Sequence, residues 1–226
     1  MQWEASIKAL KKDPYFKELI QKHGTPRLED DREPFAALVR AIVHQQVSGK
    51  AAETIFGRFV ALFPKNKFPT PAQVLKMPTE KMRAVGLSGQ KTSYIKDLAE
   101  KFANGTIKHT DLHTMESGEL IEHLVQVKGV GVWTAHMFLI FTLHRADVLP
   151  TGDLGVRKGF QVVYGLRSLP DHKKMEALAK GWRQHASAAS WYLWRVADEV
   201  NAAGRPKIVA SAKPPKARKP VKKKSL

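Results

Sequence analysis

Helix start and stop signals follow one another along almost the whole chain, and no stretch between turn signals alternates apolar and polar residues as a β-strand does. The segment DPYFKELIQKHG is an example, with Asp13 as N-cap, Pro14 in the first turn and Gly24 at the end. In EPFAALVRAIVHQQ and SGKAAETIFGRFVALF, apolar residues recur at helical spacing. Further helices are predicted at residues 70–75, 88–102, 116–127, 131–143, 155–166, 170–182 and 185–200. The sequence therefore predicts an all-α fold.

Size and composition limit the kind of protein. With 226 residues, 43% of them hydrophobic, the chain can bury a core in one large domain or in two small lobes. It has no cysteine, which excludes disulfides, iron–sulfur clusters, thiol chemistry and cysteine-ligated zinc. The first residues lack an apolar core of signal-peptide length, and the longest apolar run, 137–141, is too short to span a bilayer. We expect a soluble cytoplasmic protein without membrane contacts.

The charge points to a polyanionic partner. The 38 Lys and Arg residues against 21 Asp and Glu give a formal net charge of +17, which favours nucleic acid. A merely solubilising basic surface, or association with ribosomes, is the alternative. Residues 206–226 contain eight basic residues, no acidic residue and several prolines, so we expect a disordered tail there. The tail either lies along phosphates or only keeps the protein soluble.

Residues 128–131, KGVG, join two helices. The preceding helix ends in an apolar stripe, and residues 132–143 are apolar nearly all round, which predicts a buried helix. Glycines at 129 and 131 allow positive φ and leave no side chains in the way, so backbone N–H groups at the start of the second helix can approach an anion. A phosphate would fit there, although an ordinary helix–helix turn would explain one of the two glycines.

The segment LVQVKGVGVWTA resembles the helix-hairpin-helix motif L-x-x-L-P-G-V-G-x-x-T-A, and LPTGD resembles the Gly/Pro-rich loop with a catalytic Asp of the helix-hairpin-helix DNA glycosylases. VHQQVSGKAAETIFGRF, GLSGQKTSYIKDLA and SWYLWRVADEV are similar to the 3-methyladenine DNA glycosylase II family within that superfamily. The resemblance covers residues 33–200 in collinear order. It departs at Lys128, where Pro is usual, and in WRQHASAASWYLW, which lacks the usual Pro and Arg. It implies two helical lobes around a cleft, without an N-terminal β-domain, over residues 1–205.

The resemblance also implies how DNA is held. Such an enzyme flips the damaged base out of the duplex and fills the gap. Gln46, at the end of the helix of residues 33–46, matches the family's intercalating plug, and Ser48 matches a residue that faces the minor groove. Read alone, Gln46 would be a polar helix end. The predicted DNA contacts are Gln46, Ser48, Lys50, Lys128, Gly129, Val130, Gly131 and Thr134.

Asp153 is the predicted catalytic residue, because it stands at the Asp of the LPTGD loop. Cleavage of the N-glycosidic bond develops positive charge on the sugar, which an adjacent carboxylate stabilises while it orients water. A purine alkylated at N3 or N7 already carries positive charge and can leave without a general acid, so one carboxylate suffices. Without the family, Asp153 would be read as the N-cap of the following helix, and the two roles are compatible.

Trp133 stands two residues after the second hairpin glycine, where glycosylases with lyase activity have a nucleophilic Lys. The resemblance therefore implies a monofunctional enzyme, with the indole stacking on a cationic base. Trp194 matches a pocket aromatic, while Met137 and Leu154 match positions where some relatives have Tyr. Each Trp alone would be read as a core residue. Relatives hold a monovalent cation with hairpin carbonyls, here those of Val125, Val127 and Val130; no other metal or cofactor is expected.

We therefore predict a monomeric glycosylase that removes alkylated purines from double-stranded DNA and leaves an abasic site. It would work in the nucleoid of a bacterium or the nucleus of a eukaryote. A non-catalytic DNA-binding protein on the same scaffold, or a glycosylase for deaminated or mismatched bases, are the alternatives. The sequence does not rank 3-methyladenine, 7-methylguanine, hypoxanthine, etheno adducts or 1-methyladenine as substrates.

Overall fold

The computed structural model describes residues 3–26, 33–64 and 67–203. The predicted basic tail, residues 206–226, lies outside them. The described part is helical with no strand, so the predicted all-α class is confirmed. The chain divides into two compact units, each of which combines segments distant in sequence. None of the described helices has the length and hydropathy needed to cross a lipid bilayer.

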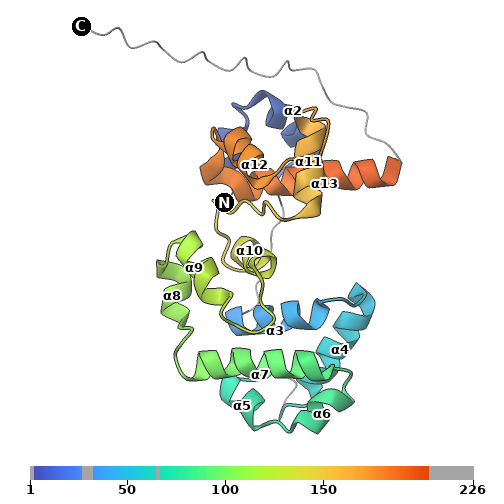
Figure 1. Ribbon diagram of the computed structural model, residues 1–226, viewed down its shortest axis with the longest axis vertical. Helices are drawn as coiled ribbons and strands as arrows, with labels where there is room; N and C mark the ends of the chain where they lie inside the picture. The colour runs from blue at the N-terminus through green and yellow to red at the C-terminus, as the bar shows by residue number, and fades with distance from the viewer. Residues whose placement is uncertain (1–2, 27–32, 65–66, 204–226) are drawn as a thin grey trace, which may run out of the picture. The chain divides into compact units, whose positions relative to one another are not determined.

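Among the described residues, unit 1 combines residues 3–26, 151–182 and 188–203. Its helices are α1 (Glu4–Leu10), α2 (Pro14–His23), α11 (Leu154–Val163), α12 (His172–Ala179) and α13 (Ala186–Ala203), the last of which joins the unit from residue 188 (Figure 1). Aromatic rings form its centre: Phe16 of α2 lies edge-on to Trp182 and Tyr192. The hydroxyl of Tyr192 donates to the carbonyl of Gly24 at 2.7 Å. The N-terminal helices therefore pack with the C-terminal ones, as expected.

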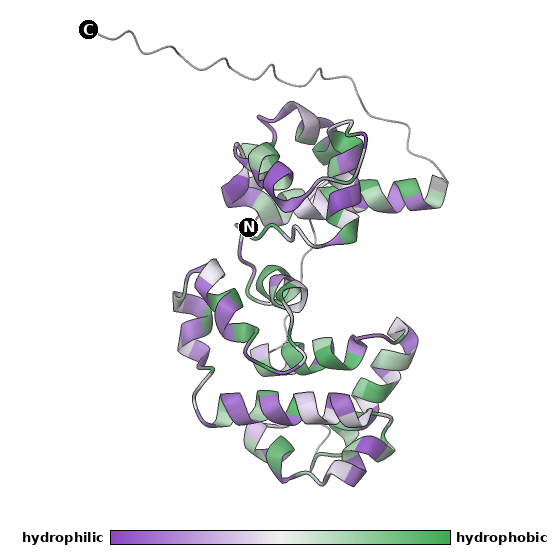
Figure 2. Cartoon of the chain, in the orientation of Figure 1, coloured by the Kyte–Doolittle hydropathy of each residue, from purple (hydrophilic) through white to green (hydrophobic). Residues whose placement is uncertain are grey.

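Within the described part of the chain, unit 2 combines residues 33–64 and 67–150 with residues 183–187. Its helices are α3 (Pro34–His44), α4 (Gly49–Ala61), α5 (Pro71–Lys76), α6 (Thr79–Ala84), α7 (Gly89–Ala103), α8 (His109–Thr114), α9 (Ser117–Leu124), α10 (Val132–Phe141) and the short 3-10 helix η2 (Arg183–His185). Helix α7 packs against α3, α5 and α6, while α10 packs against α9 and α3. Hydrophilic and hydrophobic segments alternate along α7 (Figure 2), as they do in a helix with one face in the core.

Several predicted helix boundaries are confirmed. Asp13 caps α2 by accepting the N–H of Tyr15 at 2.9 Å, and Gly24 ends the helix with φ 70°. The predicted apolar stripe of α3 is buried throughout. Helices α1, α6 and α8 were not predicted, because each has only six or seven residues, which is too short for a repeated apolar pattern.

Two of the differences between predicted and observed helices affect the predicted site. Helix α3 ends at His44, so Gln46 lies beyond the helix and adopts φ 56°. Helix α10 ends at Phe141 rather than residue 143, and it is not buried all round, since Val132 and Trp133 are 53% and 52% exposed. Apolar composition alone does not show that the first turn of a helix projects beyond the core that covers the rest.

Candidate DNA-binding interface and active site

The hairpin between α9 and α10 is anchored by its two buried valines. Val127 and Val130 are 1% and 3% exposed, and the N–H of Val130 donates to the carbonyl of Val127 at 3.0 Å. A tight turn with both side chains in the core is thereby fixed. The side chain of Val130 packs in the core and its N–H is bonded within the hairpin, and its predicted contact with DNA stays a prediction.

The two hairpin glycines have different roles. Gly129 has φ 82°, and a Cβ there would lie 2.1 Å from Cδ2 of Tyr94 on α7, so both the conformation and the space require glycine. Gly131 was also predicted to use positive φ, but its φ is −91°, and a Cβ at this position would have no other group within 4 Å. Gly131 is the N-cap of α10, and its missing side chain leaves the start of that helix open.

The start of α10 can accept an anion. The first N–H groups of a helix have no acceptor within it, and here they follow a glycine that cannot cap them. No acidic residue stands in this first turn. Lys128 is exposed beside it, with its own N–H bound to the carboxylate of Asp97 at 2.9 Å. Thr134 is buried, so its predicted DNA contact would involve its N–H rather than its hydroxyl.

The loop between α3 and α4 presents the other predicted DNA contacts. Gln46, Ser48 and Lys50 are all exposed. Ser48 is the N-cap of α4, and its side chain makes no capping hydrogen bond. Gln46 reaches solvent from a left-handed backbone conformation that is uncommon for residues other than glycine. The exposure of Gln46 is consistent with its predicted role as the plug, although Gln46 lies in a loop and not at the end of a helix.

Sequence reasoning missed the residues that brace these two elements. Gln45 donates its side-chain N–H to the carbonyl of Gly129 at 2.7 Å, and Lys91 donates to the carbonyl of Val43 at the same distance. Burial lowers the pKa of the Lys91 ammonium. Residues 91, 94 and 97 are spaced three apart within the segment GLSGQKTSYIKDLA. This spacing places them on the same side of a helix, and it was the signal in the sequence that these three residues act together.

In unit 1, the carboxylate of Asp153 is held by two donors. Its Oδ1 accepts the N–H of Val156 at 2.8 Å, so Asp153 is the N-cap of α11, as the sequence predicted. The same oxygen accepts the indole N–H of Trp194 at 2.8 Å. Trp194 was predicted as a pocket wall, and the hydrogen bond gives it a second role in orienting the carboxylate.

Glycines on α11 allow this arrangement. A Cβ at Gly155 would lie 2.8 Å from Cδ1 of Trp194, and a Cβ at Gly159 would lie 2.4 Å from the carbonyl oxygen of Leu193. Helices α11 and α13 therefore approach closely enough for the indole to reach Asp153 only because both positions lack side chains. Neither glycine was singled out from the sequence.

The remaining predicted pocket residues are accessible apolar groups. Trp133 and Leu154 are 52% and 53% exposed, which excludes the reading of Trp133 as a core residue. Met137, one turn after Trp133 on α10, is half-buried.

Burial, together with the charge of Arg183, lowers the pKa of the neighbouring His136, so this imidazole is neutral at neutral pH and adds no positive charge to the helix.

Residues 39–184, which hold the hairpin and Asp153, match the family model described as "HhH-GPD superfamily base excision DNA repair protein". The chain belongs to this superfamily. It is 36% identical over 178 residues to DNA-3-methyladenine glycosylase 1 of Schizosaccharomyces pombe, covering 78% of each chain. The predicted family, fold and enzyme class are therefore confirmed: the protein is a DNA glycosylase of base excision repair.

Two solved structures of such glycosylases share the fold. The 3-methyladenine DNA glycosylase of S. pombe in complex with abasic DNA is 36% identical, with a TM-score of 0.72 and coverage of 86% of this chain and 97% of that one. The DNA-3-methyladenine glycosidase of Bacillus halodurans is 34% identical, with a TM-score of 0.78 and coverage of 87% and 91%. The first of these two structures holds that relative bound to abasic DNA.

The predicted cation ligands of this glycosylase are backbone carbonyls in its hairpin. The carbonyl of Val127 accepts the N–H of Val130, but a carbonyl oxygen has a second lone pair and can still coordinate an ion. Carbonyl donors of this kind suit a hard monovalent cation. Among the described residues, no three His, Asp or Glu side chains gather as metal ligands.

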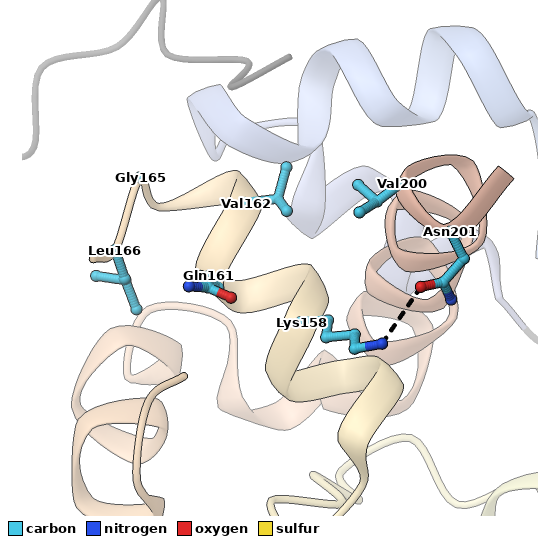
Figure 3. Close-up of a pocket in the computed structure, with 7 residues that line it drawn as sticks. All are labelled: Lys158, Gln161, Val162, Gly165, Leu166, Val200 and Asn201. Carbon is cyan, nitrogen blue, oxygen red and sulfur yellow. Dashed lines mark hydrogen bonds between the residues drawn. The ribbon is translucent and has the colours of Figure 1, made fainter. Parts of the chain in front are cut away.

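A pocket of about 370 Å³, separate from the predicted site residues, lies beside α11 and α13 of unit 1. Figure 3 shows Lys158 at its edge, donating to the side-chain carbonyl of Asn201 at 3.3 Å. Val162, Leu166 and Val200 supply its apolar wall. It contains none of the predicted site residues and no carboxylate, so it plays no part in the glycosylase site.

Proposed function

We propose that this glycosylase flips alkylated, positively charged purines out of double-stranded DNA and hydrolyses the N-glycosidic bond, leaving an abasic site. The two hydrogen bonds that hold the carboxylate of Asp153 are the main support for this proposal. Its Oδ1 is bound by the N–H of Val156 and the indole N–H of Trp194, each at 2.8 Å. A carboxylate fixed by two donors is preorganised, so it needs little rearrangement when charge develops on the sugar.

The chemistry needs one carboxylate. As the bond to the base lengthens, the sugar gains oxocarbenium character, which the negative charge of Asp153 stabilises while the carboxylate orients the attacking water. A base alkylated at N3 or N7 leaves as a neutral molecule and requires no proton from a general acid. Neutral damaged bases would leave more slowly, and this difference gives the selection for cationic lesions.

The DNA contacts divide between gap filling and backbone binding. Gln46 would occupy the space vacated by the flipped base, with Ser48 facing the minor groove and Lys50 near the backbone. The first N–H groups of α10, opened by Gly131, would bind a phosphate beside Lys128. The relative from S. pombe that binds abasic DNA shares this fold, which supports the assignment. All these contacts come from one chain, so we expect a monomer.

Trp133 supplies a face for the extruded base and no nucleophile. An exposed indole attracts a cationic ring through its π-electrons, and it cannot form a Schiff base with the sugar. We therefore expect hydrolysis without strand cleavage. A monovalent cation on the carbonyls of Val125, Val127 and Val130 would strengthen the attraction for phosphate. No other cofactor is required, and the substrate places the protein with chromosomal DNA, in a bacterial nucleoid or a eukaryotic nucleus.

The alternative to a catalytic glycosylase is a DNA-binding protein without catalytic activity, and one observation is consistent with it. Asp153 caps α11, so its presence would be explained by stability alone. The second hydrogen bond, from Trp194, favours catalysis, because a cap does not need it.

Base release from duplexes that each carry one lesion tests the proposal. The panel should contain 3-methyladenine, 7-methylguanine, 1-methyladenine, hypoxanthine and an etheno adduct. We expect release of the cationic purines, with the strand intact until alkali or heat is applied and no complex trapped by borohydride. Release of hypoxanthine alone would reassign the substrate class, a trapped complex would reveal a lysine nucleophile, and no release from any duplex would favour the binding protein.

A further inference from the structure

The loop of the plug residue and the phosphate-binding hairpin are joined by one side chain. Gln45 is the C-cap of α3, immediately before Gln46, and its Nε2 donates to the carbonyl of Gly129 at 2.7 Å across a separation of 84 residues. Both partners are partly buried. The residue that fills the gap in DNA is thus adjacent to a residue bonded to the element that binds the backbone.

The hairpin end of this link is rigid without Gln45. The ring of Tyr94 lies against Gly129, leaving no room even for a methyl group. The carboxylate of Asp97 accepts the N–H of Lys128 at 2.9 Å, and Val130 is buried. Helix α7 therefore fixes the Gly129 carbonyl, which acts as a stationary acceptor.

The loop end is different, because its conformation is unfavourable by itself. Gln46 has φ 56°, a region that side chains other than glycine disfavour. Lys91 holds the end of α3 through the carbonyl of Val43, and Glu53 of α4 pairs with His44 at 3.2 Å. Gln45 is the side chain that ties the intervening segment to the hairpin.

Both elements border a common hollow. It has a volume of about 450 Å³ and is lined by the loop, by the start of α7 and by the hairpin. Its lining residues are Gln45, Gln46, Val47, Ser88, Gln90, Lys91, Tyr94 and Gly129. Without the Gln45 bond, the loop could relax into this open space and carry the plug with it.

We propose that Gln45 is a positioning residue that holds Gln46 in a fixed register with the hairpin, so that gap filling and phosphate binding act as one preorganised unit. The inference rests on the proposed function, which supplies the roles of plug and anchor. It assigns Gln45 no contact with the substrate. Its effect on DNA should therefore disappear when the plug is removed.

A double-mutant cycle tests this dependence. The variants are Gln45→Ala, Gln46→Ala and the double variant, and the ligand is a duplex with an uncleavable abasic-site analogue. We expect Gln45→Ala to weaken binding about tenfold in the wild-type background, as for loss of one buried hydrogen bond, and less than about twofold in the Gln46→Ala background. Equal losses in both backgrounds would overturn the proposal.

The variant Gln45→Glu gives a readout that a purely structural role would not produce. Glutamate has the shape of glutamine but donates a hydrogen bond only when protonated. We expect its affinity for the same duplex, relative to wild type, to recover as the pH falls from about 7 to about 4, through the ordinary pKa of a glutamate carboxyl. A constant ratio across this range would contradict the proposal, and this test remains usable if Gln45→Ala unfolds.

A 2-aminopurine opposite the abasic site reports gap filling directly. Its fluorescence should change on binding of wild type and of Gln45→Glu at low pH, but not of Gln46→Ala. None of these measurements requires base release. Failure of wild type to excise any lesion would refute the proposed function, whereas an additive cycle with normal excision would refute only the role of Gln45.

Discussion

At the scale of single residues, the hydrogen bonds to Asp153 determine what the carboxylate can do. One oxygen accepts both the N–H of Val156 and the indole N–H of Trp194, so the side chain is held from its own helix and from α13. A capped helix needs only the first bond. The second bond connects the carboxylate to an aromatic residue that the resemblance had placed in the base pocket, and it explains why Gly155 must lack a side chain.

Replacing Trp194 with Phe should therefore slow excision. The substitution keeps an aromatic ring and removes the donor to a charged acceptor, which is worth about 1.5–3 kcal/mol. We expect single-turnover excision to fall about tenfold or more, with little change in affinity for abasic DNA. Trp191→Phe is the matched control, because it changes another indole of α13 that packs beside Arg195. Equal effects of the two substitutions would mean that loss of a large ring, rather than the bond to Asp153, is responsible.

At the scale of elements, α7 supports the hairpin that is proposed to bind DNA. Tyr94 packs on Gly129, and Asp97 binds the N–H of Lys128. The two glycines of the hairpin differ accordingly, since Gly129 is required by the fold and Gly131 is surrounded by open space. One glycine thus serves stability and the other leaves room for the ligand.

Gly129→Ala and Gly131→Ala should separate these roles. Positive φ and the contact with Tyr94 should make the first destabilising by more than about 2 kcal/mol, lowering Tm by about 5 °C or more. The second should leave Tm unchanged and weaken DNA binding at every salt concentration, because a methyl group would stand among the N–H groups of α10. Gly118→Ala, at another glycine with open surroundings, should change neither quantity. Normal DNA binding by Gly131→Ala would show that the hairpin is not the phosphate anchor.

Local features of the elements were predictable from the sequence, and long-range ones were not. Asp13 and Asp153 both occupy the predicted N-cap positions, because capping depends on neighbouring residues. The bond from Gln45 to Gly129 joins residues 84 positions apart and follows from packing alone. The plug was placed on a helix because its apolar stripe continues to residue 43, while the end of the helix at His44 has no Gly or Pro to mark it.

At the scale of the whole molecule, charge supplies attraction that no single contact explains. The chain carries +17, of which residues 206–226, outside the described part, contribute eight positive charges. Charges of this kind bind phosphate in a salt-dependent manner and carry no base specificity. In the proposed mechanism they would act on encounter and affinity, whereas Asp153 would act on the reaction.

Deleting residues 206–226 should therefore weaken DNA binding and flatten its dependence on salt concentration. Saturated single-turnover excision should hardly change, because the chemistry does not involve the tail. A shorter truncation after Val221, which removes three of the eight basic residues, should give an intermediate salt slope. An unchanged slope in both truncations would leave the tail with solubility as its only role, and abolished excision at saturation would place it in the active site.

The catalytic role of Asp153 is tested most directly by Asp153→Asn under single-turnover conditions. Asparagine can still accept the N–H groups of Val156 and Trp194, so the substitution removes the charge and keeps the cap. Asp171→Asn is the matched control, since Asp171 caps α12 in the same way through the N–H of Lys174 at 2.8 Å. We predict near-normal binding of lesion DNA by Asp153→Asn, with excision slower by at least about 3 kcal/mol, roughly a hundredfold, and normal excision by Asp171→Asn. Excision by Asp153→Asn at the wild-type rate would contradict the role of Asp153 as the catalytic carboxylate.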